Sequence, residues 1–225
     1  MRTLCIDTSA ATALALVEDG ITLASARSDD PRRHAEEIGS GALEVVRAAG
    51  ASSFADAGIG RVCVGTGPGP FTGLRAGIAF AKSLGKGLNV PVLGVWSQEA
   101  HALAGLKASE ASVELVLSDA RRSEVYWGIY RETEGGLEVV VPPSVGPLQD
   151  ALHVAQGTGV KVVTGPEKVV AAIGNEFETF PALVQPELFA GLADGGGRTF
   201  SLEPLYLRRP DIQGVSPEPL PIPER

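Results

Sequence analysis

Cysteine and histidine are scarce in this chain of 225 residues. Its two cysteines, Cys5 and Cys63, lie in apolar, strand-like runs without a CxxC motif, which indicates buried reduced thiols rather than a disulfide framework. The three histidines, His34, His101 and His153, form no HxxxH or HExxH pair of the kind that binds zinc. The chain also lacks a GxxxxGK[ST] phosphate loop and a GxSxG nucleophile elbow. No complete catalytic constellation can be read from the sequence.

Long apolar runs and an excess of positive charge are missing as well. No run reaches the roughly 18 apolar residues of a membrane span, and Asp7 interrupts the N-terminus before a signal-peptide core could form. We therefore expect a cytoplasmic protein with no membrane partner. The net charge of −8 disfavours an extended nucleic-acid-binding face, because such faces need clustered Lys and Arg. Hydrophobic residues make up 44% of the chain, enough for a sizeable core.

The order of the apolar runs predicts an α/β fold built from a repeated unit. In the first half we expect strands at 4–8, 13–18 and 21–27, a helix at 33–49, a strand at 59–65, a helix at 72–88 and a strand at 91–95. In the second half we expect strands at 113–118, 124–132 and 137–141, a helix at 147–156, a strand at 160–164 and a helix at 167–175. The same order in both halves indicates a duplicated β-β-β-α-β-α unit with partly parallel sheets covered by helices.

The predicted domains follow from this repeat. The first lobe spans residues 1–97, and a helical connector at 98–108 begins the second lobe, which spans 98–209. Five of the last sixteen residues are proline, which removes hydrogen-bond donors and blocks regular structure. We therefore expect residues 210–225 to be an extended or disordered tail.

A loop rich in Gly and Pro at 65–70 leads directly into the helix at 72–88. Glycines let successive backbone N–H groups converge with a helix dipole on an anion. Asp7 stands where a strand ends, the place from which a carboxylate in a two-lobed nucleotide-binding fold reaches a metal–phosphate group. The candidate phosphate site comprises Asp7, Thr8, Gly67 and Gly69. The alternative is that Asp7, Thr8 and Ser9 only satisfy turn backbone groups through short side-chain hydrogen bonds.

The helix at 72–88 is apolar on nearly all sides. From position 75 to 86 its charged residues, Arg75, Lys82 and Lys86, fall within an arc of roughly 40°, which is narrow for a helix at a surface. One flank would meet the sheet, and the other would meet either the helix at 33–49 or a partner subunit. The predicted partner interface comprises His34, Ile38, Ala42, Val45, Phe71, Leu74, Arg75, Ile78 and Lys82. We expect Ile78→Glu or Leu74→Glu to abolish partner binding and to leave the fold intact.

Residues 119–126, DARRSEVY, place two arginines and two acids at a predicted hairpin turn. Ion pairing within the hairpin is one interpretation. Binding of a ligand or a protein partner by Arg121 and Arg122 is the other, and the sequence leaves both open.

Over about its first 210 residues the chain resembles the bacterial TsaB family, also called YeaZ. The resemblance rests on IDTS at 6–9, RRHAEE at 32–37, GTGPGPFTGLRAGIAFAKSLG at 65–85, DARRSEVY at 119–126, TGP at 164–166 and LYLRRPD at 205–211. It implies the duplicated actin-like and Hsp70-like fold (ASKHA, RNase H-like), with two lobes that each hold a mixed sheet flanked by helices. This agrees with the repeat predicted from the order of elements.

The resemblance further implies a non-catalytic subunit. Its first lobe would pair with a homologous catalytic subunit of the TsaD type, and an ATPase subunit of the TsaE type would join. The complex would transfer a threonylcarbamoyl group to N6 of the adenosine 3′ to the anticodon in tRNAs that read codons beginning with A. The chain would hold no cofactor of its own, with ATP and Mg²⁺ acting in the complex; it would contact tRNA indirectly and could form a homodimer in isolation.

Three positions depart from the family's pattern. Ile38 stands where the catalytic relatives carry the second histidine of a metal-binding pair, which fits a scaffold. Pro70 stands where the family more often has Ser in GPGSFTG, which weakens the case for a phosphate at the loop. Ala35 also replaces the usual Ser.

Two other functions compete with this interpretation. An autonomous ATP-dependent enzyme, such as a small-molecule kinase, would need Asp7 for metal, the loop 65–69 for phosphate and the glycines 195–197 for adenosine. A glycoprotease-like peptidase is the third candidate, with little chemical basis without a histidine pair.

Overall fold

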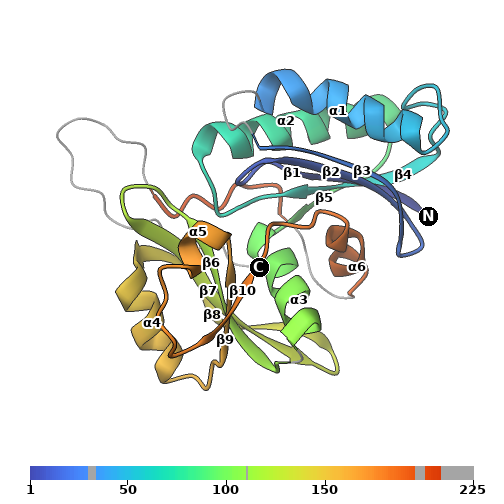
Figure 1. Cartoon of the computed structure of the whole chain (residues 1–225). Helices are drawn as coiled ribbons and strands as arrows, with labels where there is room; N and C mark the ends of the chain where they lie inside the picture. Colours follow the sequence, from blue (N-terminus) through green and yellow to red (C-terminus); the bar gives the residue numbers. More distant parts are fainter. Residues whose placement is uncertain (30–33, 110, 196–200, 209–225) are drawn as a thin grey trace. The chain divides into compact units, whose positions relative to one another are not determined.

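The computed structural model describes residues 1–29, 34–109, 111–195 and 201–208, with the side chains of His34 and Ala35 excluded. The chain divides into two compact units (Figure 1). The first contains the described residues of Met1–Ser97 and Gln185–Leu205, and the second contains those of Gln98–Val184 and of the segment that begins at Tyr206. The segment Gln185–Leu205 thus groups with the first unit, although the sequence-based division placed it in the second lobe. The predicted tail at 210–225 lies outside the described residues.

A five-stranded mixed sheet forms the centre of the first unit. Its strands are β1 (Arg2–Asp7), β2 (Thr12–Glu18), β3 (Ile21–Ser28), β4 (Ile59–Gly65) and β5 (Val92–Val95), in the order β3-β2-β1-β4-β5. β1, β2 and β3 pair antiparallel, whereas β1, β4 and β5 pair parallel. This is the expected antiparallel meander followed by parallel strands.

Helices cover both faces of this sheet. α1 (His34–Ala48) and α2 (Phe71–Leu88) pack on one face, and the short α6 (Leu188–Asp194) packs on the other (Figure 1). Alternation along β1 sets the two faces: Leu4 and Ile6 join the core under α1 and α2, while Cys5 points to the side of α6. β4 repeats the pattern, so both cysteines are buried free thiols, as predicted.

The second unit repeats the first. Its strands are β6 (Val113–Asp119), β7 (Glu124–Thr133), β8 (Gly136–Pro147), β9 (Val162–Gly165) and β10 (Glu178–Pro181), and its helices are α3 (Ser97–Ser109), α4 (Leu148–Gln156) and α5 (Glu167–Val170). Written as β8-β7-β6-β9-β10, its sheet has the strand order and the directions of the first sheet. The predicted duplication and the predicted fold class, an α/β fold with two mixed sheets flanked by helices, are confirmed.

The predicted elements were wrong at a few places in the second half of the chain. β10 and α6 were not predicted, because four and seven residues are too few to show a periodicity. The helix expected at 167–175 ends at Val170, before Gly174. β8 continues through Pro142 and Pro143 to Pro147, beyond the strand end expected at residue 141. Proline is tolerated there because β8 is an edge strand.

No helix within the described part of the chain is long and apolar enough to cross a membrane.

Candidate functional site

Asp7 ends β1 as a buried carboxylate whose two oxygens both accept hydrogen bonds. Its Oδ1 accepts from the backbone N–H of Ser9 at 2.9 Å and from the hydroxyl of Ser9 at 2.6 Å. Its Oδ2 accepts from the hydroxyl of Ser97, also at 2.6 Å. Burial raises the pKa of Asp7, and the bonds from Ser9 and Ser97 oppose that rise. The chain therefore supplies its own donors to this carboxylate.

The loop at 65–70 closes tightly over the end of β1. A Cβ at Gly65 would overlap Oδ2 of Asp7, and one at Gly69 would lie 2.6 Å from the carbonyl oxygen of Ser9. The loop backbone also accepts a hydrogen bond from the start of α3, because the N–H of Ser97 donates to the carbonyl of Gly67 at 2.8 Å. Because Gly65 and Gly69 have no Cβ, the loop can pack directly against the turn that follows β1. Phosphate binding by Asp7, Thr8, Gly67 and Gly69 stays a prediction.

Thr8 connects the β1 turn to α2. Its hydroxyl donates to the carbonyl of Gly73 at 2.8 Å, and a Cβ at Gly77 would overlap its Oγ1. Pro70 is the N-cap of α2 in an extended conformation (φ −61°, ψ 138°), without a side-chain capping hydrogen bond. The family's more frequent Ser would have supplied a capping hydroxyl here. The arrangement holds α2 in place through close glycine contacts with Thr8.

Most of the predicted interface residues are buried in the first unit. Five of them are at most 5% exposed: Ile38, Ala42, Val45, Leu74 and Ile78. Their side chains pack in the chain's own core and do not offer a surface to a partner, which corrects their assignment as direct contacts. A helical wheel shows which positions are apolar but not what covers them. The other four differ: Phe71 is half-buried, Arg75 and Lys82 are exposed, and the side chain of His34 lies outside the described residues.

The second apolar flank of α2 meets α1, one of the two alternatives that the sequence left open. Phe80 of α2 packs edge-to-face against Phe54 with ring centroids 6.5 Å apart, and a Cβ at Gly39 would lie 3.8 Å from the Phe80 ring. Phe80, Leu84 and Leu88 are partly buried against the core of the first unit. The narrow polar arc of α2 thus follows from α1 and the sheet covering its two flanks.

Charges of opposite sign follow the exposed sides of the two helices. We call the α1–α2 surface the exposed residues of these helices within the described side chains, which are Glu36, Ser40, Glu44, Arg47 and Ala48 of α1 and Thr72, Arg75, Ala79, Lys82, Ser83, Lys86 and Gly87 of α2. On α1 acids predominate, and the charged residues of α2 are all basic. Arg75 also lies over the Phe71 ring, 5.9 Å from its centroid, which limits the freedom of its guanidinium group.

A buried acid in the second unit was not singled out in the sequence. Glu114 of β6 is completely buried; its Oε2 accepts from the hydroxyl of Thr164 at 2.9 Å, and no group in the described residues hydrogen-bonds to its Oε1. Burial raises its pKa to about 8, so the carboxyl group is protonated at neutral pH. The sequence signal for this buried acid was a single Glu inside the apolar run VELVL at 113–117.

The β6–β7 turn is the exposed tip of a buried hairpin. Arg121, Arg122 and Ser123 are exposed, whereas Ala120 and Val125 on either side are buried. All three exposed residues have a positive φ, of 62°, 53° and 61°. The prediction of a hairpin turn at 119–126 is confirmed.

Within the described residues no group of three or more His, Cys, Asp or Glu side chains could hold a metal ion.

Comparisons with known proteins agree on one family. The family model described as TsaD, tRNA N6-adenosine threonylcarbamoyltransferase, matches residues 28–194. The tRNA threonylcarbamoyladenosine biosynthesis protein TsaB of Escherichia coli is 33% identical over 172 residues, which cover 73% of this chain and 72% of that protein. An uncharacterised protein of Mycobacterium leprae is 36% identical over 97% of this chain, which spans 58% of that relative's length. The solved structure of YeaZ from Pseudomonas aeruginosa matches 92% of this chain and 99% of its own, with 25% identity and a TM-score of 0.72.

Proposed function

The chain belongs to the TsaB family, and from this membership we propose that it acts in threonylcarbamoyladenosine biosynthesis as a non-catalytic subunit. Its partner would be a homologous catalytic subunit of the TsaD type, joined by an ATPase subunit of the TsaE type. The complex would modify N6 of the adenosine 3′ to the anticodon in tRNAs that read codons beginning with A. The chain would work in the cytoplasm and support the catalytic subunit by binding it.

The α1–α2 surface carries this proposal. The exposed residues of α1 include acids, such as Glu44, and those of α2 include bases, such as Lys82. A homologous partner would have the same pair of helices, and a two-fold rotation would bring its first helix over α2 of this chain. Acids would then face bases on both sides of the interface, which favours that orientation. The same geometry would let two copies of this chain pair in isolation.

The packing around Asp7 supports a non-catalytic role. Its carboxylate accepts three hydrogen bonds from Ser9 and Ser97, and Gly65 and Gly69 lie against Asp7 and Ser9 with no room for a Cβ. A nucleotide phosphate at this loop would have to compete with these contacts. We therefore propose that ATP and Mg²⁺ act in the assembled complex and that the isolated chain holds neither.

Substitutions on the exposed side of α2 test the partner surface. Ala79 is exposed between Arg75 and Lys82, so Ala79→Glu places a carboxylate one turn from each base and does not disturb the helix. We expect Ala79→Glu with Lys82→Glu to abolish co-purification with the catalytic subunit and to leave the melting temperature of the isolated chain unchanged. The matched control is Lys161→Glu, an exposed charge reversal in the second unit.

Undiminished co-purification of the double variant would contradict this surface. The role itself is tested by reconstituting tRNA modification from purified subunits with and without this chain. We expect modification only when the chain is present, and equal modification without it would contradict the proposed function.

A further inference from the structure

The β6–β7 turn adopts a backbone conformation that its sequence does not favour. Arg121, Arg122 and Ser123 are three consecutive residues in the left-handed region, which L-residues with a Cβ avoid for steric reasons. The other two hairpins place at most one residue with a side chain in this region: Asp19 precedes Gly20 between β2 and β3, and Gly136 stands alone at the start of β8. Glycine or asparagine would adopt this backbone conformation at a lower conformational cost than Arg-Arg-Ser does.

Hydrogen bonds hold this conformation. Ala120 N–H donates to the carbonyl of Glu124 at 3.0 Å, and Glu124 N–H donates to the carbonyl of Arg121 at the same distance. Asp119 Oδ1 accepts from the backbone N–H of Arg121 at 2.7 Å, and the carboxylate of Glu124 pairs with Arg208. The turn therefore presents two adjacent arginine side chains on a fixed backbone whose flanking residues are buried.

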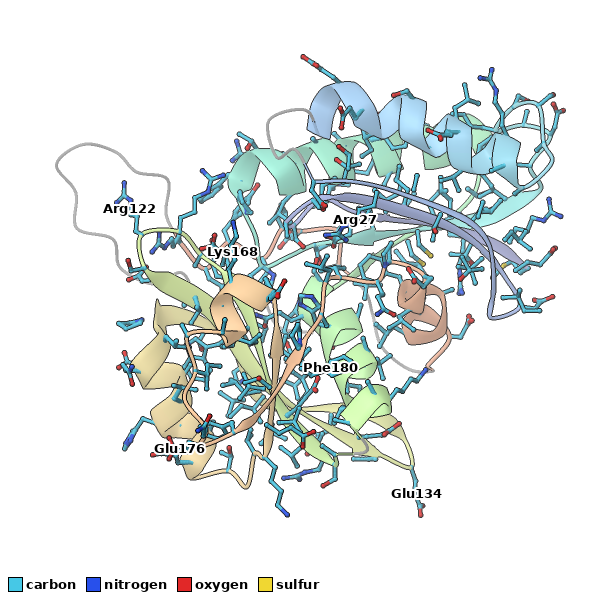
Figure 2. The ribbon with its side chains drawn as sticks, in the orientation of Figure 1. Arg27, Arg122, Glu134, Lys168, Glu176 and Phe180 are labelled. Atoms are coloured by element: carbon cyan, nitrogen blue, oxygen red, sulfur yellow. The ribbon has the colours of Figure 1, made fainter. Side chains whose placement is uncertain are left out.

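A further basic residue lies at the same edge of the second sheet. β6 and β9 pair parallel, so the turn that follows β6 and the helix α5 that follows β9 both begin at the carboxyl ends of these strands. Lys168 is an exposed residue of α5, and Figure 2 shows it with Arg122 at this end of the unit. The net charge of the chain is −8, so the basic residues Arg121, Arg122 and Lys168 contrast with the acidic character of the chain as a whole.

We infer that the turn at Arg121 and Arg122, with Lys168, contacts the phosphodiester backbone of the tRNA substrate in the assembled complex. Guanidinium groups bind phosphate oxygens in a bidentate geometry, and two of them on one turn can bind phosphates of the same RNA strand. Because the contact is small and the chain is acidic, the catalytic subunit must provide most of the tRNA site. This inference rests on the proposed function, and it replaces indirect tRNA contact with a direct one.

The test measures tRNA affinity of the complete complex, with unmodified tRNA and a series of KCl concentrations. We expect Arg121→Ala with Arg122→Ala to weaken binding about tenfold and to lower the slope of log K against log salt by about 1.5, the value for two lost phosphate contacts. Lys168→Ala should lower the slope by about 0.8. Arg131→Ala is the control, since this arginine lies near the other end of β7 in a pair with Glu138.

A second pair of variants separates phosphate binding from a role in the turn. Arg121→Gly with Arg122→Gly removes both guanidinium groups and suits the positive φ values, so we expect an equal or higher melting temperature together with the same loss of tRNA affinity. Unchanged affinity and slope in both double variants, with a wild-type complex that binds tRNA, would overturn this inference alone. Loss of the catalytic subunit from the double variants would also overturn it and make the turn a protein contact. If the wild-type complex binds no tRNA, the proposed function fails and the inference falls with it.

Discussion

Nη1 of Arg61 lies 2.6 Å from Oδ1 of Asp194, and this ion pair joins residues 133 positions apart in the sequence. The Arg61 side chain is 8% exposed and makes two further bonds, from Nε to the hydroxyl of Thr3 and from Nη2 to the carbonyl of Ala190. Through these contacts a single guanidinium group on β4 attaches α6 to the first sheet. They contribute to the grouping of α6 with the first unit.

Removal of Arg61 should cost more stability than removal of Asp194. Arg61→Ala removes the buried bonds to the hydroxyl of Thr3 and to the carbonyl of Ala190, and we expect the free energy of unfolding to fall by about 2 kcal/mol. The Asp194 side chain is 64% exposed, so Asp194→Asn should cost less than about 1 kcal/mol. Urea unfolding measures both values. An equal loss in the two variants would show that the ion pair, and not the buried hydrogen bonds, holds α6.

Neighbouring positions on α2 should differ strongly in how much stability the same substitution costs. Ile78 is 5% exposed, and Ile78→Glu buries a carboxylate among apolar side chains, which should lower the free energy of unfolding by at least about 3 kcal/mol. Ala79 is exposed, so Ala79→Glu should change it by less than about 0.5 kcal/mol. Circular dichroism during thermal unfolding of the isolated chain tests the contrast. A stable, folded Ile78→Glu variant would contradict the placement of this side chain in the core.

The sequence predicted the long, periodic elements well because their length makes a pattern visible. β4 begins and ends where it was predicted, and α2 differs from the predicted helix by one residue. β10 and α6 escaped detection because short segments carry no period. The site was harder, since the apolar flank of α2 at Phe80 predicted a covering surface but could not say that α1 supplies it. The bond from Ser97 to Asp7 likewise joins positions that only the fold brings together.

Glu114 should make stability depend on pH between about 5 and 8. Its pKa is raised from 4.5 to about 8 in the folded chain, so in this interval the folded state binds more protons than the unfolded state. The stabilisation is fully present below pH 4.5 and is lost as the pH rises towards 8, at up to about 1.4 kcal/mol per pH unit. Glu114→Gln keeps an acceptor for Thr164 and cannot titrate, so its stability should lack this slope. Urea unfolding of both proteins from pH 5 to 8 gives the difference, and parallel curves would contradict the raised pKa.

The isolated chain should not bind ATP. A phosphate at the loop 65–70 would have to displace bonds that the chain makes for itself, because Ser9 and Ser97 already donate to Asp7 and the backbone N–H of Ser97 bonds to the carbonyl of Gly67. We therefore expect isothermal titration with ATP and Mg²⁺ to give no heat of binding at millimolar nucleotide. The catalytic partner added to the same cell is the control, since the proposed complex should then take up the nucleotide. Micromolar binding by the isolated chain, lost in Asp7→Asn, would contradict this prediction and favour an autonomous kinase.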